Sequence, residues 1–223
     1  MRAGEVRRRL LADILAAGAP YGLALSGGHA VQAHGLVDRP SRDVDVATES
    51  PVGTGEIVDA VRAGLEERGW QVRTTETEPL GARLVVTDAA TGEECAVQVA
   101  KEVLWRPPVP TELGTALSVE DLVGTRVRAL ADHGLAPDLV DVHAAADRWS
   151  HPELEELGRR HAGDAFDLAD LRARLDGAEW IDDGEFTAYG LDDRCVAELR
   201  RWAQAWADDI GERLAESTAP EEE

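Results

Sequence analysis

The segment that decides the fold is residues 23–49, LALSGGHAVQAHGLVDRPSRDVDVATE. An apolar run leads into Ser26, Gly27 and Gly28, which favours a short buried strand that ends in a glycine turn. The stretch HAVQAHGL then has the pattern of a helix closed by Gly35. The last part, RDVDVAT, alternates polar and apolar residues, as expected for a strand with one wet face.

Two aspartates lie two residues apart in this last predicted strand. Asp43 and Asp45 should therefore project from one face, while Val44 and Val46 face the core. Neighbouring carboxylates repel each other, and each raises the pKa of the other, unless a cation lies between them. Mg²⁺ suits such a pair because it takes one or two carboxylates and completes its shell with water and substrate phosphates. We therefore expect Asp43 and Asp45 to bind Mg²⁺ or Mn²⁺.

The glycine turn supplies the second half of a nucleotide site. Gly27 and Gly28 allow backbone N–H groups to approach a phosphate, whose charge the start of the following helix favours. Ser26 adds a hydroxyl group. A triphosphate held between this turn and a carboxylate-bound metal is the arrangement of a nucleotidyl-transfer site with an NTP as substrate. Arg42 either neutralises the acidic cluster or contacts phosphate, and His29 either faces the nucleotide or has a surface or capping role.

The remaining pattern predicts an α/β (α+β) protein, in which a small mixed-sheet core with flanking helices is followed by a helical C-terminal region. The prolines of LWRPPVPTELGTAL indicate a connection without regular structure, after which the strand signal disappears. The domains expected are 1–105, 106–216 and a frayed acidic tail at 217–223. The predicted strands are 23–25, 42–48, 71–78, 82–88 and 94–100, and the predicted helices are 4–17, 29–36, 54–69, 118–134, 137–149, 151–163, 167–177 and 192–216.

Composition narrows the class of protein. The 223 residues carry a formal net charge of −21, which argues against a general grip on nucleic acid but leaves room for a local basic groove. Such a charge suits solubility or a cationic substrate. Cys95 and Cys195 are expected to be reduced thiols in a cytoplasmic protein, and no apolar run reaches membrane-spanning length. Trp202 and Trp206 favour a core or interface role over base stacking.

The motif LSGGHAVQAHGLVDRPSRDVDVAT resembles the signature of the DNA-polymerase-β-like nucleotidyltransferase superfamily: a small-residue turn, a helix, then Asp-x-Asp on a strand. Within it the chain is most similar to the AbiEii/AbiGii toxin-type family, and second to small antibiotic nucleotidyltransferases. RPSRDVDV resembles the family's R-x-T-x-D-hydrophobic-D, with Ser41 where threonine is usual. The likeness covers roughly residues 20–150. It implies transfer of a nucleotidyl group to a hydroxyl of a tRNA end, a protein or a small molecule, and a cognate antitoxin-like partner.

The chain departs from the family pattern at two positions. Gln98 occupies the place of a third acidic residue, unless the register differs and Glu94 or Glu102 takes that place. Arg126 replaces the family's phosphate-contacting lysine, and arginine also binds phosphate. Asp138 matches a later acidic position of the family. These changes leave a second interpretation open, in which the protein is a catalytically impaired binding or regulatory relative.

Overall fold

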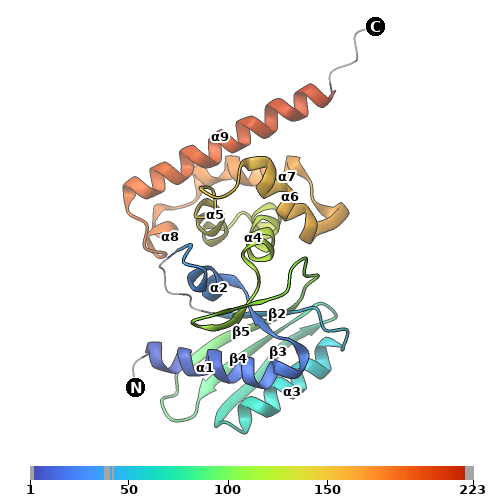
Figure 1. Ribbon diagram of the computed structural model, residues 1–223. Helices are drawn as coiled ribbons and strands as arrows, with labels where there is room; N and C mark the ends of the chain where they lie inside the picture. The colour runs from blue at the N-terminus through green and yellow to red at the C-terminus, as the bar shows by residue number, and fades with distance from the viewer. Residues whose placement is uncertain (1–2, 38–40, 42, 219–223) are drawn as a thin grey trace. The chain divides into compact units, whose positions relative to one another are not determined.

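The structure of the chain is a computed structural model that describes residues 3–37, 41 and 43–218 (Figure 1). The chain forms two compact units, Met1–Leu122 and Val123–Glu223. The first unit is mixed α/β and the second is helical, so the predicted fold class is confirmed. Among the described residues, no helix is long and apolar enough to cross a membrane.

A seven-stranded mixed sheet forms the centre of the first unit in the described part of the chain. Its strand order is β3-β4-β5-β2-β1-β7-β6. β2 runs parallel to β5 and β1 runs parallel to β7, whereas the other neighbours are antiparallel. The strands are β1 (Ala24–Leu25), β2 (Val44–Thr48), β3 (Trp70–Glu78), β4 (Gly81–Asp88), β5 (Glu94–Lys101), β6 (Val109–Thr111) and β7 (Gly114–Ala116).

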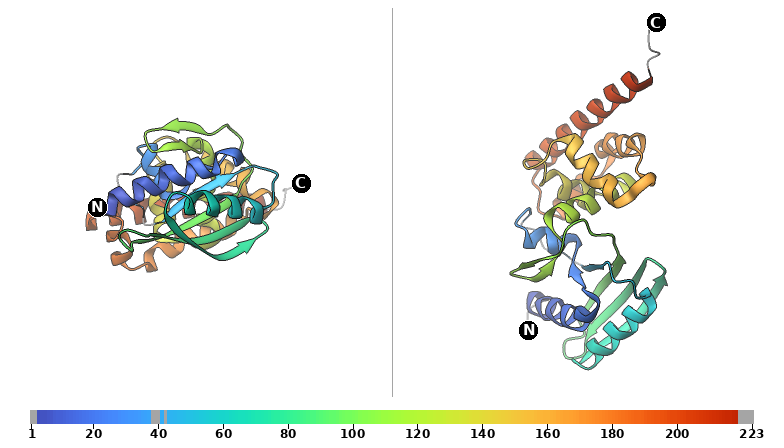
Figure 2. Two further views of the ribbon diagram at one scale, coloured as in Figure 1. Left: turned by 90° about the horizontal axis from the view of Figure 1, so that it is seen from below. Right: turned by 45° about the vertical axis from the view of Figure 1, so that its right-hand side comes forward.

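Two helices, α1 (Ala3–Gly18) and α3 (Thr54–Glu66), cover one face of this sheet. They lie side by side over the strands in Figure 2. Their apolar residues recur at helical spacing, and the resulting stripes are buried against the inward residues of β2, β4 and β5. The inward residues include Val44, Val46, Leu84, Val97 and Val99. Because strand side chains alternate, the residues between them point to the opposite face.

The stretch predicted to lack regular structure contains two strands, so that prediction is wrong for β6 and β7. Both strands are only three residues long, and β6 contains Pro110. β7 pairs with β1 in a parallel register that joins Leu25 and Ala116. Pairing with a strand this far away in the sequence leaves no local pattern of polar and apolar residues. The periodicity of the sequence therefore did not predict these strands. The first compact unit accordingly continues through this stretch to Leu122.

Helices make up the second unit. α4 (Val119–His133) starts in the first unit and continues into the second, and its first turn is capped by Ser118, whose Oγ accepts from the Asp121 N–H at 3.1 Å. The short helix α8 (Asp183–Thr187) was not predicted. Trp206 is fully buried, in agreement with a core role. The other helices are α5 (Ala136–His143), α6 (His151–Ala162), α7 (Leu168–Asp176) and α9 (Asp193–Thr218).

Candidate functional site

The start of helix α2 (Gly27–Ala33) and strand β2 are joined through Ser26 and Asp45. The Ser26 N–H donates to the Asp45 carbonyl at 2.9 Å. Gly27 has a φ of 57°, a conformation that favours glycine. A Cβ on Gly27 would lie 1.9 Å from Asp45 Oδ2, so the carboxylate occupies the space that a side chain would need. The helix start and one carboxylate of the predicted pair are therefore in direct contact.

The other carboxylate lies just outside the strand. β2 begins at Val44, so Asp43 precedes it, and the prediction that the strand includes Asp43 is wrong. The Ser41 hydroxyl donates to the Asp43 carbonyl at 3.0 Å, which gives the approach to β2 a local turn-like bond. Asp43 is exposed and Asp45 is half-buried, while Val44 and Val46 are buried. Arg42, a predicted phosphate contact, lies outside the described residues.

Strand β5 places an amide beside Asp45. In the parallel register, Gln98 is the direct partner of Asp45. The residues before and after Gln98 on the same face of β5 are Ala96 and Ala100, which carry no charge. Glu94 lies four residues from Gln98, about 13 Å along the strand. No carboxylate of β5 therefore stands directly beside Asp45.

Two charged residues continue the row that starts at Asp45 and Gln98. Arg83 on β4 is the register partner of Gln98, and Glu76 on β3 is the partner of Arg83. Gln98, Arg83 and Glu76 are all exposed, and they line a pocket of about 330 Å³. The alternative carboxylate, Glu102, lies beyond the other end of β2, where its N–H donates to the Thr48 carbonyl at 2.9 Å.

The donor set fits a divalent metal that arrives with a nucleotide. Among the described residues, no group of three or more His, Cys, Asp or Glu side chains gathers as a metal cluster. Asp43 and Asp45 supply two carboxylates, and Mg²⁺ commonly takes one or two carboxylates together with water and substrate phosphates. The space over Gly27 is filled by the Asp45 carboxylate, which fixes that side chain at the helix start. A third protein carboxylate is not needed for such a shell.

Two further predicted site residues form an ion pair in the second unit. Arg126 Nη1 lies 3.2 Å from Asp138 Oδ1, and the Asp138 side chain is buried. Burial raises the pKa of Asp138 above its usual range, the Arg126 guanidinium opposes that rise, and Asp141 adds to it. The Nε of Arg126 is buried and has no hydrogen-bond partner among the described residues. Arg126 thus already has one anionic partner and keeps one N–H for another acceptor.

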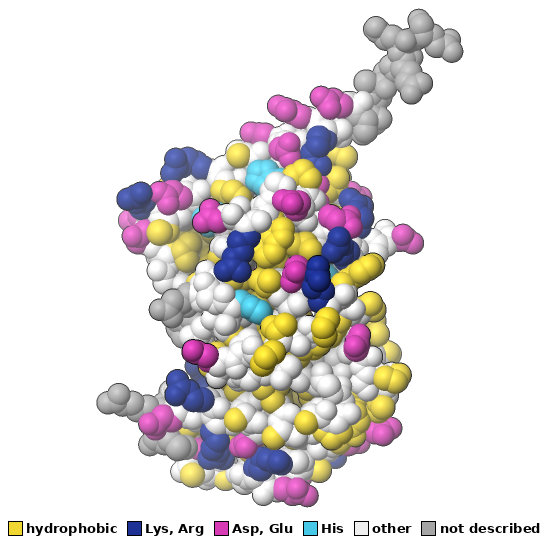
Figure 3. Space-filling view, viewed as in Figure 1, with side chains coloured by type: hydrophobic (Ala, Val, Ile, Leu, Met, Phe, Trp, Pro, Cys, Tyr) yellow, Lys and Arg dark blue, Asp and Glu magenta, His cyan; other side chains and the backbone are white. Residues whose placement is uncertain are grey.

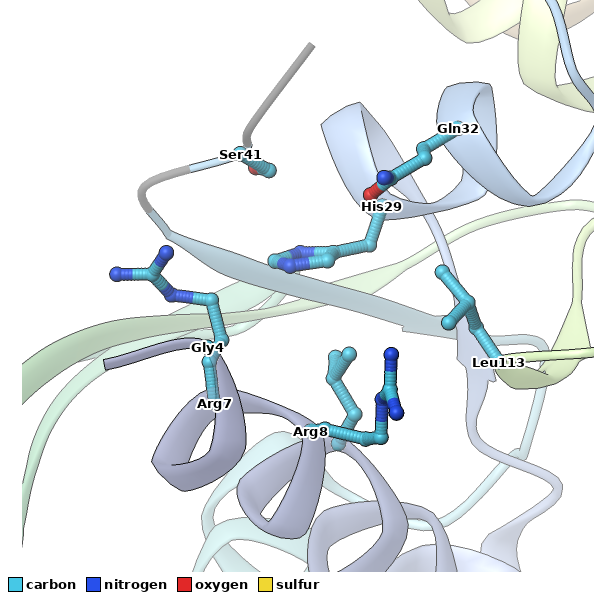
Figure 4. Close-up of a pocket in the computed structure, with 8 residues that line it drawn as sticks. Gly4, Arg7, Arg8, His29, Gln32, Ser41 and Leu113 are labelled. Atoms are coloured by element: carbon cyan, nitrogen blue, oxygen red, sulfur yellow. The ribbon is translucent and has the colours of Figure 1, made fainter. Parts of the chain in front are cut away.

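The sequence analysis did not single out Arg7 and Arg8. Both arginines rise from α1 into a pocket of about 210 Å³, to which α2 contributes His29 and Gln32 (Figure 4). Ser41 also lines this pocket. The sequence carried a signal, because residues 7–9 are a run of three arginines in a strongly acidic chain. The amphipathic pattern of the first helix explained that run without a ligand.

Comparison with known families gives the geometry a context. The sequence pattern of the family described as "Nucleotidyl transferase AbiEii toxin, Type IV TA system" matches residues 9–214. The chain belongs to this family. The match extends well past residue 150, the limit of the resemblance found in the sequence alone. None of the curated proteins matches the chain.

Solved structures show the same fold as this AbiEii-family chain. MenT4, a nucleotidyltransferase toxin from Mycobacterium tuberculosis, is 18% identical with a TM-score of 0.62, over 92% of this chain and 82% of MenT4. JHP933 from Helicobacter pylori is also 18% identical, with a TM-score of 0.55 over the whole of both chains. The likeness establishes a nucleotidyltransferase fold, and a shared fold alone does not assign a function to the residues of the site.

Proposed function

We propose that this AbiEii-family chain binds an NTP with Mg²⁺ or Mn²⁺ where β2 meets the start of α2, and transfers the nucleotidyl group to an acceptor hydroxyl. One observation carries the proposal: the Asp45 carboxylate lies against Gly27, at the first residue of a helix. A metal held by Asp45 would lie beside backbone N–H groups that face the phosphates.

Each residue of the site has a defined task in this proposal. The N–H groups at Gly27 and Gly28 and the Ser26 hydroxyl hold phosphate oxygens, and Asp43 and Asp45 hold the metal. When bound, the metal would neutralise charge on the phosphates and on the leaving oxygen. The acceptor oxygen forms a bond to the α-phosphorus, the bond to pyrophosphate breaks, and the hydroxyl proton passes to a carboxylate or to water. Gln98 is a neutral amide and does not take that proton.

The family also suggests the biological setting. Its description names a toxin of a type IV toxin–antitoxin system. We therefore propose that this chain acts as the toxin of such a pair, with a cognate antitoxin as its partner. The acceptor classes that remain are a tRNA end, a protein side chain and a small molecule.

A specific observation favours a second candidate function. Gln98 stands directly beside Asp45, and the same face of β5 offers only Ala96 and Ala100 next to it. A site without a third carboxylate has less capacity to activate an acceptor hydroxyl or to hold a second metal. In this second candidate, the chain binds a nucleotide or partner as a regulatory protein with little or no turnover.

Calorimetric titration tests the binding step. Each NTP is titrated with Mg²⁺ into the unaltered protein and into an Asp43→Asn/Asp45→Asn variant. Asp59→Asn, on the exposed face of α3, serves as the control for loss of a carboxylate. The proposal expects metal-dependent binding that the double variant loses and the control keeps. Absence of binding to a well-folded unaltered protein would refute the proposed site.

A transfer assay then separates the two candidates. Labelled NTP is incubated with the protein and with tRNA, protein and small-molecule acceptor pools. Label that moves to one pool, and that depends on Asp43 and Asp45, supports transfer. Binding without any transfer supports the regulatory candidate.

A further inference from the structure

The pocket between α1 and α2 is lined by cationic and hydrogen-bonding side chains. Its described lining includes Arg7, Arg8, His29, Gln32 and Ser41, together with Gly4, Leu11 and Leu113, and it contains no acidic side chain. The chain as a whole has 44 acidic residues against 23 Lys and Arg. The described lining of this pocket therefore carries positive charge from two guanidinium groups, whereas the chain as a whole is strongly negative.

The arginines of the pocket are not consumed by ion pairs within the described chain. The third arginine of the run, Arg9, lies over the Trp70 ring and pairs with Asp13 and Asp88. Arg7 and Arg8 have no such carboxylate partner among the described residues. The Arg7 Nε is buried and lacks a hydrogen-bond acceptor there. A buried N–H donor without an acceptor is costly, so a ligand that brings acceptors is favoured.

The pocket adjoins the proposed nucleotide site. His29 follows Gly27 and Gly28 in the first turn of α2, and Ser41 donates to the Asp43 carbonyl. In Figure 4, the Arg7 side chain extends from α1 to the side of the pocket where Ser41 and His29 lie.

The surface around this pocket is mixed in sign. Several Lys and Arg side chains gather over α1 in the lower part of Figure 3, with acidic side chains among them. Because positive and negative side chains are mixed there, the electrostatic potential of the surrounding surface does not by itself favour an anion. Selection has to come from the pocket itself, where two planar guanidinium groups and an amide present several N–H donors at short range.

We infer that the pocket formed by Arg7, Arg8, Gln32 and Ser41 is a phosphate-binding subsite. This inference extends the proposed function, since it concerns a phosphate beside the proposed nucleotide site. Two sources have the same chemistry: the terminal phosphates of the NTP, and a phosphodiester of a nucleic-acid acceptor. The second source, a phosphodiester, would replace the cationic acceptor that the net charge of the chain suggests.

The test measures phosphate binding without metal, so it does not depend on the carboxylates. Tripolyphosphate, ATP and a short single-stranded RNA are titrated in the absence of Mg²⁺ into the full-length protein and an Arg7→Gln/Arg8→Gln variant. The control, Arg62→Gln/Arg73→Gln, removes the same charge from α3 and β3 of the same unit. Circular dichroism and the unfolding midpoint establish that each variant is folded.

The inference expects the Arg7/Arg8 variant to lose at least tenfold in affinity for tripolyphosphate, against less than twofold for the control. Loss that extends to ATP but not to RNA assigns the subsite to the NTP, and loss that extends to RNA alone assigns it to the acceptor. Equal loss in both variants, or no loss in either, overturns the inference. The Asp43→Asn/Asp45→Asn variant should still bind tripolyphosphate, so a failed nucleotide site and a failed phosphate subsite give different results.

Discussion

The carboxylate of Asp45 occupies the place where a side chain of residue 27 would begin. The distance from Asp45 Oδ2 to the position of a Cβ on Gly27 is 1.9 Å, far below any contact that two atoms tolerate. Gly27 is also in the left-handed region at a φ of 57°. Backbone conformation and side-chain space thus impose the same requirement for glycine, and both serve to hold one carboxylate at a helix start.

Gly27→Ala should therefore harm both stability and binding. An alanine in the left-handed region costs about 1–2 kcal/mol, and displacement of Asp45 adds to this. We expect a loss of about 1–3 kcal/mol in the free energy of unfolding by urea, and metal-dependent NTP binding weakened at least tenfold. Gly55→Ala on α3, where a Cβ meets no atom within 4 Å, is the control and should be neutral or stabilising by up to roughly 1 kcal/mol. Equal behaviour of the two variants would contradict the role of Gly27.

Gln98→Asp should create a stronger metal site. The new carboxylate would stand beside Asp45, so the two charges would repel each other without a cation and attract one when it is present. We expect a lower melting temperature without metal and a larger rise on addition of Mg²⁺ or Mn²⁺ than in the unaltered protein. Gln71→Asp on β3 makes the same change of charge at another exposed strand position. A metal response that matches this control would refute the proposed position of the metal.

Arg126→Met should destabilise the second unit in a pH-dependent way. Burial raises the pKa of Asp138 and Arg126 lowers it, so loss of Arg126 raises that pKa further. A raised folded-state pKa costs stability as the pH rises above the unfolded value, near 3.9. We expect a loss of about 1–3 kcal/mol near pH 7 that shrinks as the pH falls toward about 4.

Urea unfolding at several pH values measures this effect. The double variant Arg126→Met/Asp138→Asn removes both charges and should recover part of the lost stability near pH 7. A pH-independent loss would show that Arg126 acts by packing alone.

Glu155→Gln should be strongly destabilising because the buried Glu155 side chain accepts three hydrogen bonds, two of them from an arginine. Trp206 Nε1 donates to it at 2.9 Å, and Arg213 donates through both Nη atoms at 2.8 and 2.5 Å. The loss of one partner of a buried ion pair costs about 3–5 kcal/mol. The neighbouring exposed Glu156→Gln, which breaks only surface pairs with Arg159 and Arg160, should change stability by less than about 0.5 kcal/mol. Urea unfolding followed by tryptophan fluorescence compares them, and similar midpoints would contradict the prediction.

The parts of the fold that the sequence predicts are those with local, periodic patterns. Helix α3 and the hairpin of β4 and β5 follow directly from the spacing of their apolar residues. β6 and β7 do not, because three-residue strands gain their stability from neighbours distant in sequence. The five residues of α8 are likewise too few to carry a helical period.

The site divides in the same way. The spacing of Gly27 and Asp45 predicted that they belong together, and the structure shows them in contact. The sequence does not predict that β2 begins after Asp43, because the alternation of polar and apolar residues continues through residue 43. The cationic pocket at Arg7 and Arg8 was not predicted, because arginines on the polar face of an amphipathic helix have an ordinary explanation in solubility.

The contacts of Asp45 with Gly27 and with Gln98 should form at different stages of folding. Gly27 and Asp45 are 18 residues apart, whereas Asp45 and Gln98 are 53 apart and meet only after α3, β3 and β4 are in place. The difference in loop-closure entropy is only about 1 kcal/mol, but the parallel pairing also requires the whole crossover. During folding, the contact between Gly27 at the helix start and the Asp45 carboxylate should therefore form first. The pairing of Asp45 with the uncharged Gln98 on β5 should form last.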